Sequence, residues 1–271
     1  MARLLKADLY RIVKSKLFLA AAILSVAFPI FTVLTYLVLD KVLAATTDLQ
    51  AQLGLGMNGL NMTGQALISE AFVLSSNMGL ILPIFVTIFI ATDITSGTLR
   101  NKIIAGKSRA TIYFSHLVSS GIVSAVLMFV NTLFFTLFTC LIFGYGSPID
   151  DAEMIRLLYF FATGIFTYFF TASISTALTL SIKSAAPAVI FSSLLSMGLG
   201  MIASFVHSAD PRLENKALCL IPSYTNTQFL ASAVPGAFDL EAFLLGILSY
   251  VVIGALISVA GLVIFSKKDI K

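Results

Sequence analysis

The sequence predicts an all-α membrane protein with six transmembrane helices, and three observations lead to this fold class. The chain of 271 residues is 58% hydrophobic, with a mean hydropathy of +1.00. Only 11% of its residues are charged, whereas a soluble domain carries about 25%. Six apolar runs reach the length of about 20 residues that a helix needs to cross a bilayer. So few charges cannot cover a water-facing surface, and nucleic acid is not an expected partner.

The six apolar runs are predicted to form a single transmembrane domain over residues 1–271. Their expected bounds are 17–39, 71–92, 110–143, 154–182, 188–206 and 240–265. The first run has 23 residues, more than the roughly 15 of a signal-peptide core, so we expect it to be kept as a span. The third run is too long for a bilayer core of about 30 Å. We expect its helix to be tilted, or its first turns to project and join the preceding polar stretch.

The charges outside the six runs predict how the chain is oriented in the membrane. An even number of spans places both termini on one side, and this side carries 13 of the 17 Lys and Arg residues. The opposite side carries 4 of them, together with 10 of the 13 acidic residues. Because cytoplasmic loops are enriched in Lys and Arg, both termini are predicted to be cytoplasmic.

The first 16 residues predict an amphipathic helix that lies in the membrane interface, with its cations toward anionic headgroups. One half of the helix is formed by Leu4, Leu5, Leu9, Ile12 and Val13, and the other by Arg3, Lys6, Arg11 and Lys14. Asp8 is an exception, because it lies on the apolar half. The alternative is a solvated basic leader that charge alone holds near the membrane.

Polar residues are sparse inside the predicted spans. Ionisable groups are nearly absent from their middles, which argues against a transporter driven by a proton or sodium gradient. Asn77 and Asn131 are the polar exceptions, and we expect them to bond neighbouring helices or to line a cavity. The two cysteines, Cys140 and Cys219, lack the spacing of metal ligands, and the sequence leaves open whether they pair.

The sequence contains no convincing motif for catalysis, for a cofactor or for a metal. Gly106-Lys107-Ser108 resembles the end of a nucleotide-binding P-loop, but that motif needs a glycine where Asn101 stands. His116 and His207 are predicted on opposite sides of the membrane, so they cannot share a metal ion. We therefore expect that this chain is not an enzyme and does not itself bind ATP.

The stretch from Asp93 to Arg109 is the longest polar segment on the predicted cytoplasmic side. It predicts a short cationic helix whose caps and apolar edge come from Thr95 or Ser96, Leu99, Ile103 and Gly106. Such a helix between two spans is suited to dock into a groove of a soluble partner. The alternative is an ordinary basic loop that follows the charge rule.

The order of residues in this stretch carries a family resemblance. It runs Asp93, Ser96-Gly97-Thr98, Arg100 and Gly106-Lys107-Ser108-Arg109. This order resembles the segment between spans two and three of ABC-2 type transporter permeases, which show an acidic residue, Gly-Thr, a basic helix and a Ser-Arg pair. Asp93 stands where Glu is usual in that family, and Gly106 stands where Pro is frequent. The basic N-terminal helix, the six spans and the large loop between spans five and six are also similar.

The resemblance is strongest to small bacterial permeases that accompany a separate ATPase, including those of lantibiotic and bacitracin self-protection. It implies the permease subunit of an ATP-binding cassette exporter in the bacterial cell membrane. Two permease subunits, identical or homologous, would pair among the membrane lipids. A dimer of separate ATPase subunits would bind below them and would hold the ATP and Mg. The implied role is antimicrobial peptide resistance, with an amphipathic, peptide or lipid-like substrate moved outward through an apolar cavity.

In this family the polar stretch forms a coupling helix, here about Thr95–Ala105, which the N-terminal helix would brace. The residues implied in ATPase coupling are Asp93, Ser96, Gly97, Thr98, Leu99, Arg100, Lys102, Ile103 and Arg109. Asp93 is expected either to pair with a cation of the N-terminal helix or to cap the coupling helix. A second hypothesis is a non-transporting membrane anchor or sensor partner of an ATPase complex.

Overall fold

The computed structural model describes residues 1–45, 68, 71, 77–146, 151–209, 216–224 and 240–267. Its α-helices are α1 (Ala2–Lys14), α2 (Lys16–Ala45), α5 (Asn77–Thr95), α6 (Thr98–Ile104), α7 (Arg109–Phe143), α8 (Asp151–Ile182), α9 (Ala185–Ala209) and α11 (Leu240–Lys267), and Lys216–Leu220 forms the 3-10 helix η2. Six of these, α2, α5, α7, α8, α9 and α11, are long and apolar enough to cross a membrane. Within the described residues the predicted all-α fold is therefore confirmed, with six helices that could make it a multi-pass membrane protein.

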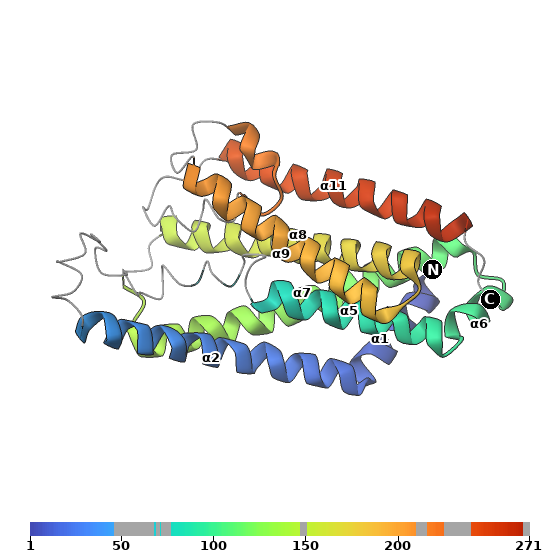
Figure 1. Cartoon of the computed structure of the whole chain (residues 1–271), viewed down its shortest axis with the longest axis horizontal. Helices are drawn as coiled ribbons and strands as arrows, with labels where there is room; N and C mark the ends of the chain where they lie inside the picture. The colour runs from blue at the N-terminus through green and yellow to red at the C-terminus, as the bar shows by residue number, and fades with distance from the viewer. Residues whose placement is uncertain are drawn as a thin grey trace.

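Helix α8 lies at the centre of the bundle, where it packs against α5, α7, α9 and α11, while α2 packs against α7 and α5 (Figure 1). The inner helices are α5 and α8, which bury 67% and 56% of their most apolar stretch. The other four bury 22–33%, so most of their apolar side chains face outward, as a bilayer requires.

Regularly spaced hydroxyl groups allow α8 to pack closely against the helices that surround it. The residues Thr163, Thr167, Thr171, Ser175 and Thr179 are buried at intervals of one helical turn. Each hydroxyl donates a hydrogen bond to the carbonyl four residues earlier in the same helix. Small hydroxyl side chains that are satisfied in this way let neighbouring helices approach closely without leaving polar groups unpaired.

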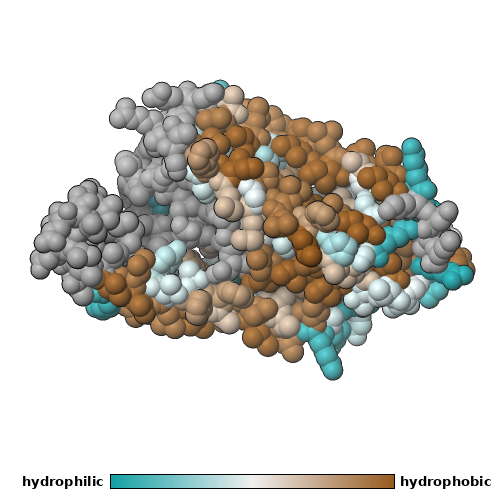
Figure 2. Space-filling model, viewed as in Figure 1, coloured by the Kyte–Doolittle hydropathy of each residue, from teal (hydrophilic) through white to brown (hydrophobic). Residues whose placement is uncertain are grey.

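Helices α1 and α6 and the last turn of α11 lie at the same end of the bundle (Figure 1). Figure 2 shows apolar side chains along the long helices and hydrophilic ones gathered at this end. The first turns of α7 pack against α1 and α6, so part of the excess length predicted for the third span lies at the level of these helices. The described part of the second span begins at Asn77, whereas it was predicted from residue 71, and residues 72–76 lie outside the described residues.

The predicted start of the short polar helix is wrong. It was expected at about Thr95, but α5 continues through that residue and α6 begins only at Thr98. Gly97 is the N-cap, with a φ of 71° and no side-chain capping bond, and it turns the chain between the two helices. The Ser96 hydroxyl therefore caps nothing, and instead shares a hydrogen bond of 2.8 Å with the hydroxyl of Thr98.

The predicted end of this helix at Gly106 is confirmed. Gly106 adopts a left-handed conformation, with a φ of 79°. Its N–H donates to the carbonyl of Ile103 at 2.9 Å, and the N–H of Lys107 donates to the carbonyl of Lys102 at 3.2 Å. These two bonds close the helix in the way that is common for a glycine after the last turn.

Asn131 makes the helix contact that was predicted for it. Its side-chain amide donates to the Ser25 carbonyl at 3.1 Å, and this bond joins α7 to α2 in the interior. Asn77 is the first residue of α5, but its side chain lies outside the described residues. Cys140 and Cys219 are both free thiols.

Helix α11 packs so closely against its neighbours at Gly261 that adding one methyl group there is predicted to lower the stability of the protein. A Cβ atom there would lie 2.6 Å from the Tyr113 hydroxyl oxygen and 2.7 Å from the Cβ of Ala177. We expect Gly261→Ala to lower the stability of the full-length protein by about 1–3 kcal/mol through overpacking. Thermal unfolding in detergent micelles measures this loss.

Gly198 in α9 provides the matched control for this substitution. A Cβ atom at Gly198 meets no atom within 4 Å. Gly198→Ala is expected to be neutral or stabilising by up to about 1 kcal/mol, because alanine is a better helix former than glycine. A Gly261→Ala protein as stable as the Gly198→Ala protein would contradict the close approach of α11.

Candidate functional site: an ionic cluster beneath helix α6

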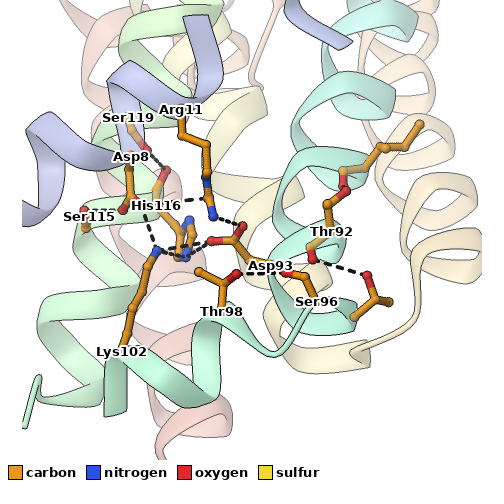
Figure 3. Close-up of polar contacts among 12 residues, drawn as sticks. Asp8, Arg11, Thr92, Asp93, Ser96, Thr98, Lys102, Ser115, His116 and Ser119 are labelled. Carbon is orange, nitrogen blue, oxygen red and sulfur yellow. Dashed lines mark hydrogen bonds and ion pairs between the residues drawn. The ribbon is translucent and has the colours of Figure 1, made fainter. Parts of the chain in front are cut away.

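Four charged side chains from three helices meet at the end of the bundle that carries α6. They are Asp8 and Arg11 of α1, Asp93 of α5 and Lys102 of α6, and together they are named the ionic cluster. Figure 3 shows these side chains pointing toward one another between the helices. Both carboxylates are buried, with no more than 2% of either residue exposed. This position is unusual, because charged groups are rarely buried unless they are paired.

Lys102 is the centre of the ionic cluster, and only 11% of its side chain is exposed. Its ammonium nitrogen lies 2.7 Å from Asp8 Oδ1 and 3.1 Å from Asp93 Oδ2. One side chain of α6 therefore binds α1 and α5 at the same time. Hydrogen bonds between charged partners at these distances are the stronger kind.

Arg11 closes the other side of the ionic cluster. Its guanidinium forms an ion pair with Asp93, and it lies 3.8 Å from Asp8 Oδ1 in its own helix. The guanidinium carbon also lies 4.9 Å from the centre of the Phe89 ring, which favours a cation. Arg11 was expected to face lipid headgroups, but the structure places it inward, because Asp93 provides a buried partner within its reach.

Helix α7 encloses the ionic cluster with two side chains. The Ser115 hydroxyl donates to Asp8 Oδ2 at 2.7 Å. The His116 ring is fully buried, and its Nε2 lies 3.5 Å from both Asp93 Oδ2 and the Lys102 ammonium. The cluster therefore joins α1, α5, α6 and α7 in one contact.

The ionic cluster brings two carboxylates, Asp8 and Asp93, against two basic side chains, Arg11 and Lys102. Burial by itself raises the pKa of Asp8, but the neighbouring His116 ring, the Lys102 ammonium and the Ser115 hydroxyl together outweigh burial and hold the pKa of this carboxyl below its usual value. Asp8 is therefore charged at neutral pH. A buried group of this kind adds little net stability compared with apolar packing, but it strongly disfavours any arrangement that separates its members.

Helix α6 has an inner and an outer face. Leu99, Lys102 and Ile103 are on the inner face, where Leu99 is buried and Ile103 packs against the hydrophobic core. Arg100 and Ile104 are exposed one turn apart on the outer face, and 73% of the Ile104 residue is exposed. An isoleucine so exposed next to cations, at the hydrophilic end of the bundle, is suited to contact with a partner.

Arg109 was expected to take part in coupling, but it has a contact of another kind. Its guanidinium donates to the carbonyls of Phe265 at 3.2 Å and of Ser266 at 2.7 Å. These carbonyls belong to the last turn of α11, where a cation is favoured by unpaired carbonyls and by the helix dipole. Ser108, the N-cap of α7, accepts a hydrogen bond from the N–H of Thr111 at 3.2 Å. The Ser-Arg pair therefore starts α7 and ties it to the end of α11.

Comparison with known protein families gives one match. The family model described as "Protein of unknown function (DUF2705)" matches residues 44–271, which is most of the chain. The protein belongs to this family. No curated protein and no solved structure matches the chain. In this DUF2705 protein, the matched residues include Asp93, Lys102 and His116, while the two α1 members of the ionic cluster precede them.

The residues of this DUF2705 protein that were predicted to take part in coupling fall into a buried group and an exposed group. Asp93 pairs with Lys102, while Leu99 and Ile103 face the hydrophobic core. Ser96 and Arg100 are exposed. The open choice for Asp93 is settled, because it pairs with the N-terminal helix and caps nothing.

Sequence reasoning missed four contributors to the ionic cluster, namely Asp8, Arg11, Ser115 and His116. One signal was present in the sequence. An acidic residue on the apolar half of an amphipathic helix needs a buried partner, and Asp8 is such a residue. The partner itself could not be found in this way, because Lys102 lies 94 residues further along the chain.

The ionic cluster is suited to hold helices together, because its ion pairs and hydrogen bonds join four of them. The two oxygens of the Asp8 carboxylate bind different helices, since Oδ1 accepts from Lys102 of α6 and Oδ2 accepts from Ser115 of α7. Among the residues that the structure describes, no three His, Cys, Asp or Glu side chains are grouped to hold a metal ion. Because Lys102 binds both Asp8 and Asp93, the ionic cluster fixes the position of α6 against α1 and α5.

Proposed function

We propose that this protein is the permease subunit of an ATP-binding cassette exporter of the ABC-2 type, with α6 as its coupling helix. The observation that carries the proposal is the combination of two faces on this short helix. The outer face exposes Arg100 and Ile104, while the inner face is joined through Lys102 to buried carboxylates of α1 and α5. A partner that moves the outer face would therefore move the helices behind it.

The contacts around α6 support transmission of a movement to several spans. Lys102 binds Asp8 and Asp93, and Asp93 is two residues from the end of α5. Ser115 links α1 to α7, and Arg109 links the start of α7 to the end of α11. Packed helices respond to a displacement as bodies, because their side chains cannot be compressed.

An external source of energy fits the composition of the spans. Ionisable residues of the six apolar helices lie near the helix ends, which leaves no relay at membrane depth for a proton or sodium gradient. In the proposed complex, a separate ATPase dimer supplies the energy from ATP and Mg. A second permease subunit, identical or homologous, completes the complex in the bacterial cell membrane, with both termini of this chain in the cytoplasm. The substrate moved outward is amphipathic, a peptide or a lipid-like molecule.

The test is to co-express the full chain with an ATP-binding cassette ATPase encoded in a neighbouring reading frame and to measure affinity in detergent. The variant Arg100→Glu combined with Ile104→Ser is expected to weaken the complex by about thirtyfold, the effect of losing a central contact of an interface. Arg3→Glu is the control, because Arg3 is exposed on α1 and lies outside the proposed contact.

Two outcomes would count against this assignment. Equal affinity of the Arg100→Glu, Ile104→Ser protein and the Arg3→Glu protein would exclude the outer face of α6 as the docking site. If the complex binds and hydrolyses ATP but moves none of a panel of amphipathic peptides and lipids in proteoliposomes, the non-transporting anchor or sensor function is favoured instead.

A further inference from the structure

An apolar groove of about 590 Å³ lies between α7, α8 and α11. Its floor includes Phe170 and Tyr250, which are buried, and its mouth is formed by exposed side chains such as Phe166 and Val259. Cavities of about 300–1,000 Å³ are the usual size for sites that bind small molecules. All three helices are long and apolar enough to cross the membrane, so this groove opens toward lipid.

The polar side chains Ser173 and Tyr250, which line the groove, already have hydrogen-bond partners within the protein. The Ser173 hydroxyl donates to the Phe169 carbonyl of its own helix at 3.0 Å. The Tyr250 hydroxyl accepts from the N–H of Ser223 at 2.8 Å. The remaining surface consists largely of aliphatic and aromatic carbon. A hydrocarbon chain packs favourably against such a surface, whereas a polar group would lose its hydrogen bonds with water there.

The length of the groove along the helices compares with one leaflet of a bilayer. On α11 it extends from Tyr250 to Val259, which is about 13.5 Å at the helical rise. Half of a hydrocarbon core measures about 15 Å. The groove is therefore about as long as half of the hydrocarbon core. On α7 its lining residues Phe114 and Leu117 lie within the first nine positions of the helix, near the end of the bundle that carries α6.

Cations lie beyond this end of the groove. Arg109 precedes the groove residue Phe114 by five positions in α7, which is about 7.5 Å, and Lys267 follows Val259 by about 12 Å in α11. Arg109 is held against the last carbonyls of α11, and Lys267 is exposed. These two side chains are at the level where the phosphate of a lipid in this leaflet would lie, and cations there attract anionic headgroups.

We infer that the groove between α7, α8 and α11 binds one acyl chain of an anionic phospholipid whose headgroup is held near Lys267 and Arg109. The inference does not rest on the proposed function, because it requires neither an ATPase nor transport. It differs from docking of a second copy of the chain, which would place protein side chains over Phe166 and Val259 and would exclude lipid.

The experiment uses the purified full-length protein in phosphatidylcholine vesicles with a trace of phosphatidylglycerol that carries a photoreactive diazirine in one acyl chain. After illumination, mass spectrometry locates the labelled residues. Label is expected to concentrate on residues that line the groove, above the exposed apolar residues of α2. Ala255→Trp fills the groove and is expected to reduce this label to the level of α2, whereas Leu256→Trp, on an exposed neighbour outside the groove, leaves it unchanged.

A second arm tests the charge. Replacing the probe by a phosphatidylcholine of the same acyl chain is expected to reduce groove labelling by severalfold, and Lys267→Gln to reduce phosphatidylglycerol labelling by up to about fivefold, the contribution of one cation near the membrane surface. Lys16→Gln is the matched control at the start of α2, since α2 is far from the groove. The inference is overturned by uniform labelling of all exposed apolar faces, by equal labelling in the two tryptophan variants, by equal labelling with the two probes, or by crosslinks between two copies at Val259.

Discussion

Replacing Lys102 with methionine is expected to lower the free energy of unfolding by about 3–5 kcal/mol, the usual effect of removing one member of a buried ion pair. The substitution leaves Asp8 and Asp93 buried with a single guanidinium between them. Methionine keeps most of the length and volume of the side chain, so packing around α6 changes little. Equilibrium unfolding of the full chain in mixed micelles measures the loss.

Two further variants show whether this loss comes from the charge. Lys107→Met removes a cation from an exposed residue of the same polar stretch and is expected to change stability by less than about 0.5 kcal/mol. Asp8→Asn added to Lys102→Met removes the unpaired carboxylate and is expected to restore about 1–3 kcal/mol. The ionic cluster would have no such role if Lys102→Met were as stable as Lys107→Met, or if the second substitution lowered stability further.

Replacing Gly97 with proline is expected to uncouple α6 from α5 and, under the proposed function, to reduce ATP-dependent transport at least about tenfold. Gly97 has a φ of 71°, whereas the proline ring holds φ near −65°. Proline also removes the N–H that donates to the Ile94 carbonyl at 3.3 Å. An increase of only about 1.4 kcal/mol in an activation barrier slows a reaction tenfold. We expect a misplaced α6 to raise the barrier to transport by at least this amount. Transport into or out of proteoliposomes with the ATPase measures the effect.

Gly97→Asn is the control for this substitution. Asparagine adopts the left-handed conformation more readily than other residues with a Cβ atom, and a Cβ atom at this position meets nothing within 4 Å. It is expected to retain most of the transport activity, and both variants are expected to keep their six spans and to insert normally. Full transport by the proline variant would show that the turn between α5 and α6 does not carry the movement.

The large elements of this fold could be predicted because they depend on local composition. Six apolar stretches form helices in a membrane because each must satisfy its own backbone hydrogen bonds. The end of α6 could also be predicted, since Gly106 supplies the left-handed conformation that closes a helix. The start could not, because Ser96 and Gly97 are both acceptable caps, and the choice between them depends on how far α5 continues.

The ionic cluster and the outer face of α6 were less accessible from sequence. Asp8 could be recognised as anomalous, but its partner is chosen by the packing of α1 against α7, which is a tertiary contact. Arg109 has the charge expected of a coupling residue, yet it binds carbonyls of a helix that ends more than 150 residues later. Ile104 lies next to Ile103 in sequence, and only the rotation of α6 about its axis decides which of the two is exposed.

The bond between Ser115 and Asp8, across 107 residues, has a consequence for how the protein is made. Helix α1 leaves the ribosome before α5, α6 and α7, so its buried partners on these helices do not exist until about a hundred more residues have been synthesised. During that interval the Asp8 carboxylate on the apolar face of α1 has only Arg11 of its own helix within reach. Docking of α1 is therefore a late event of membrane insertion, and it is complete only when the third span has entered the bilayer.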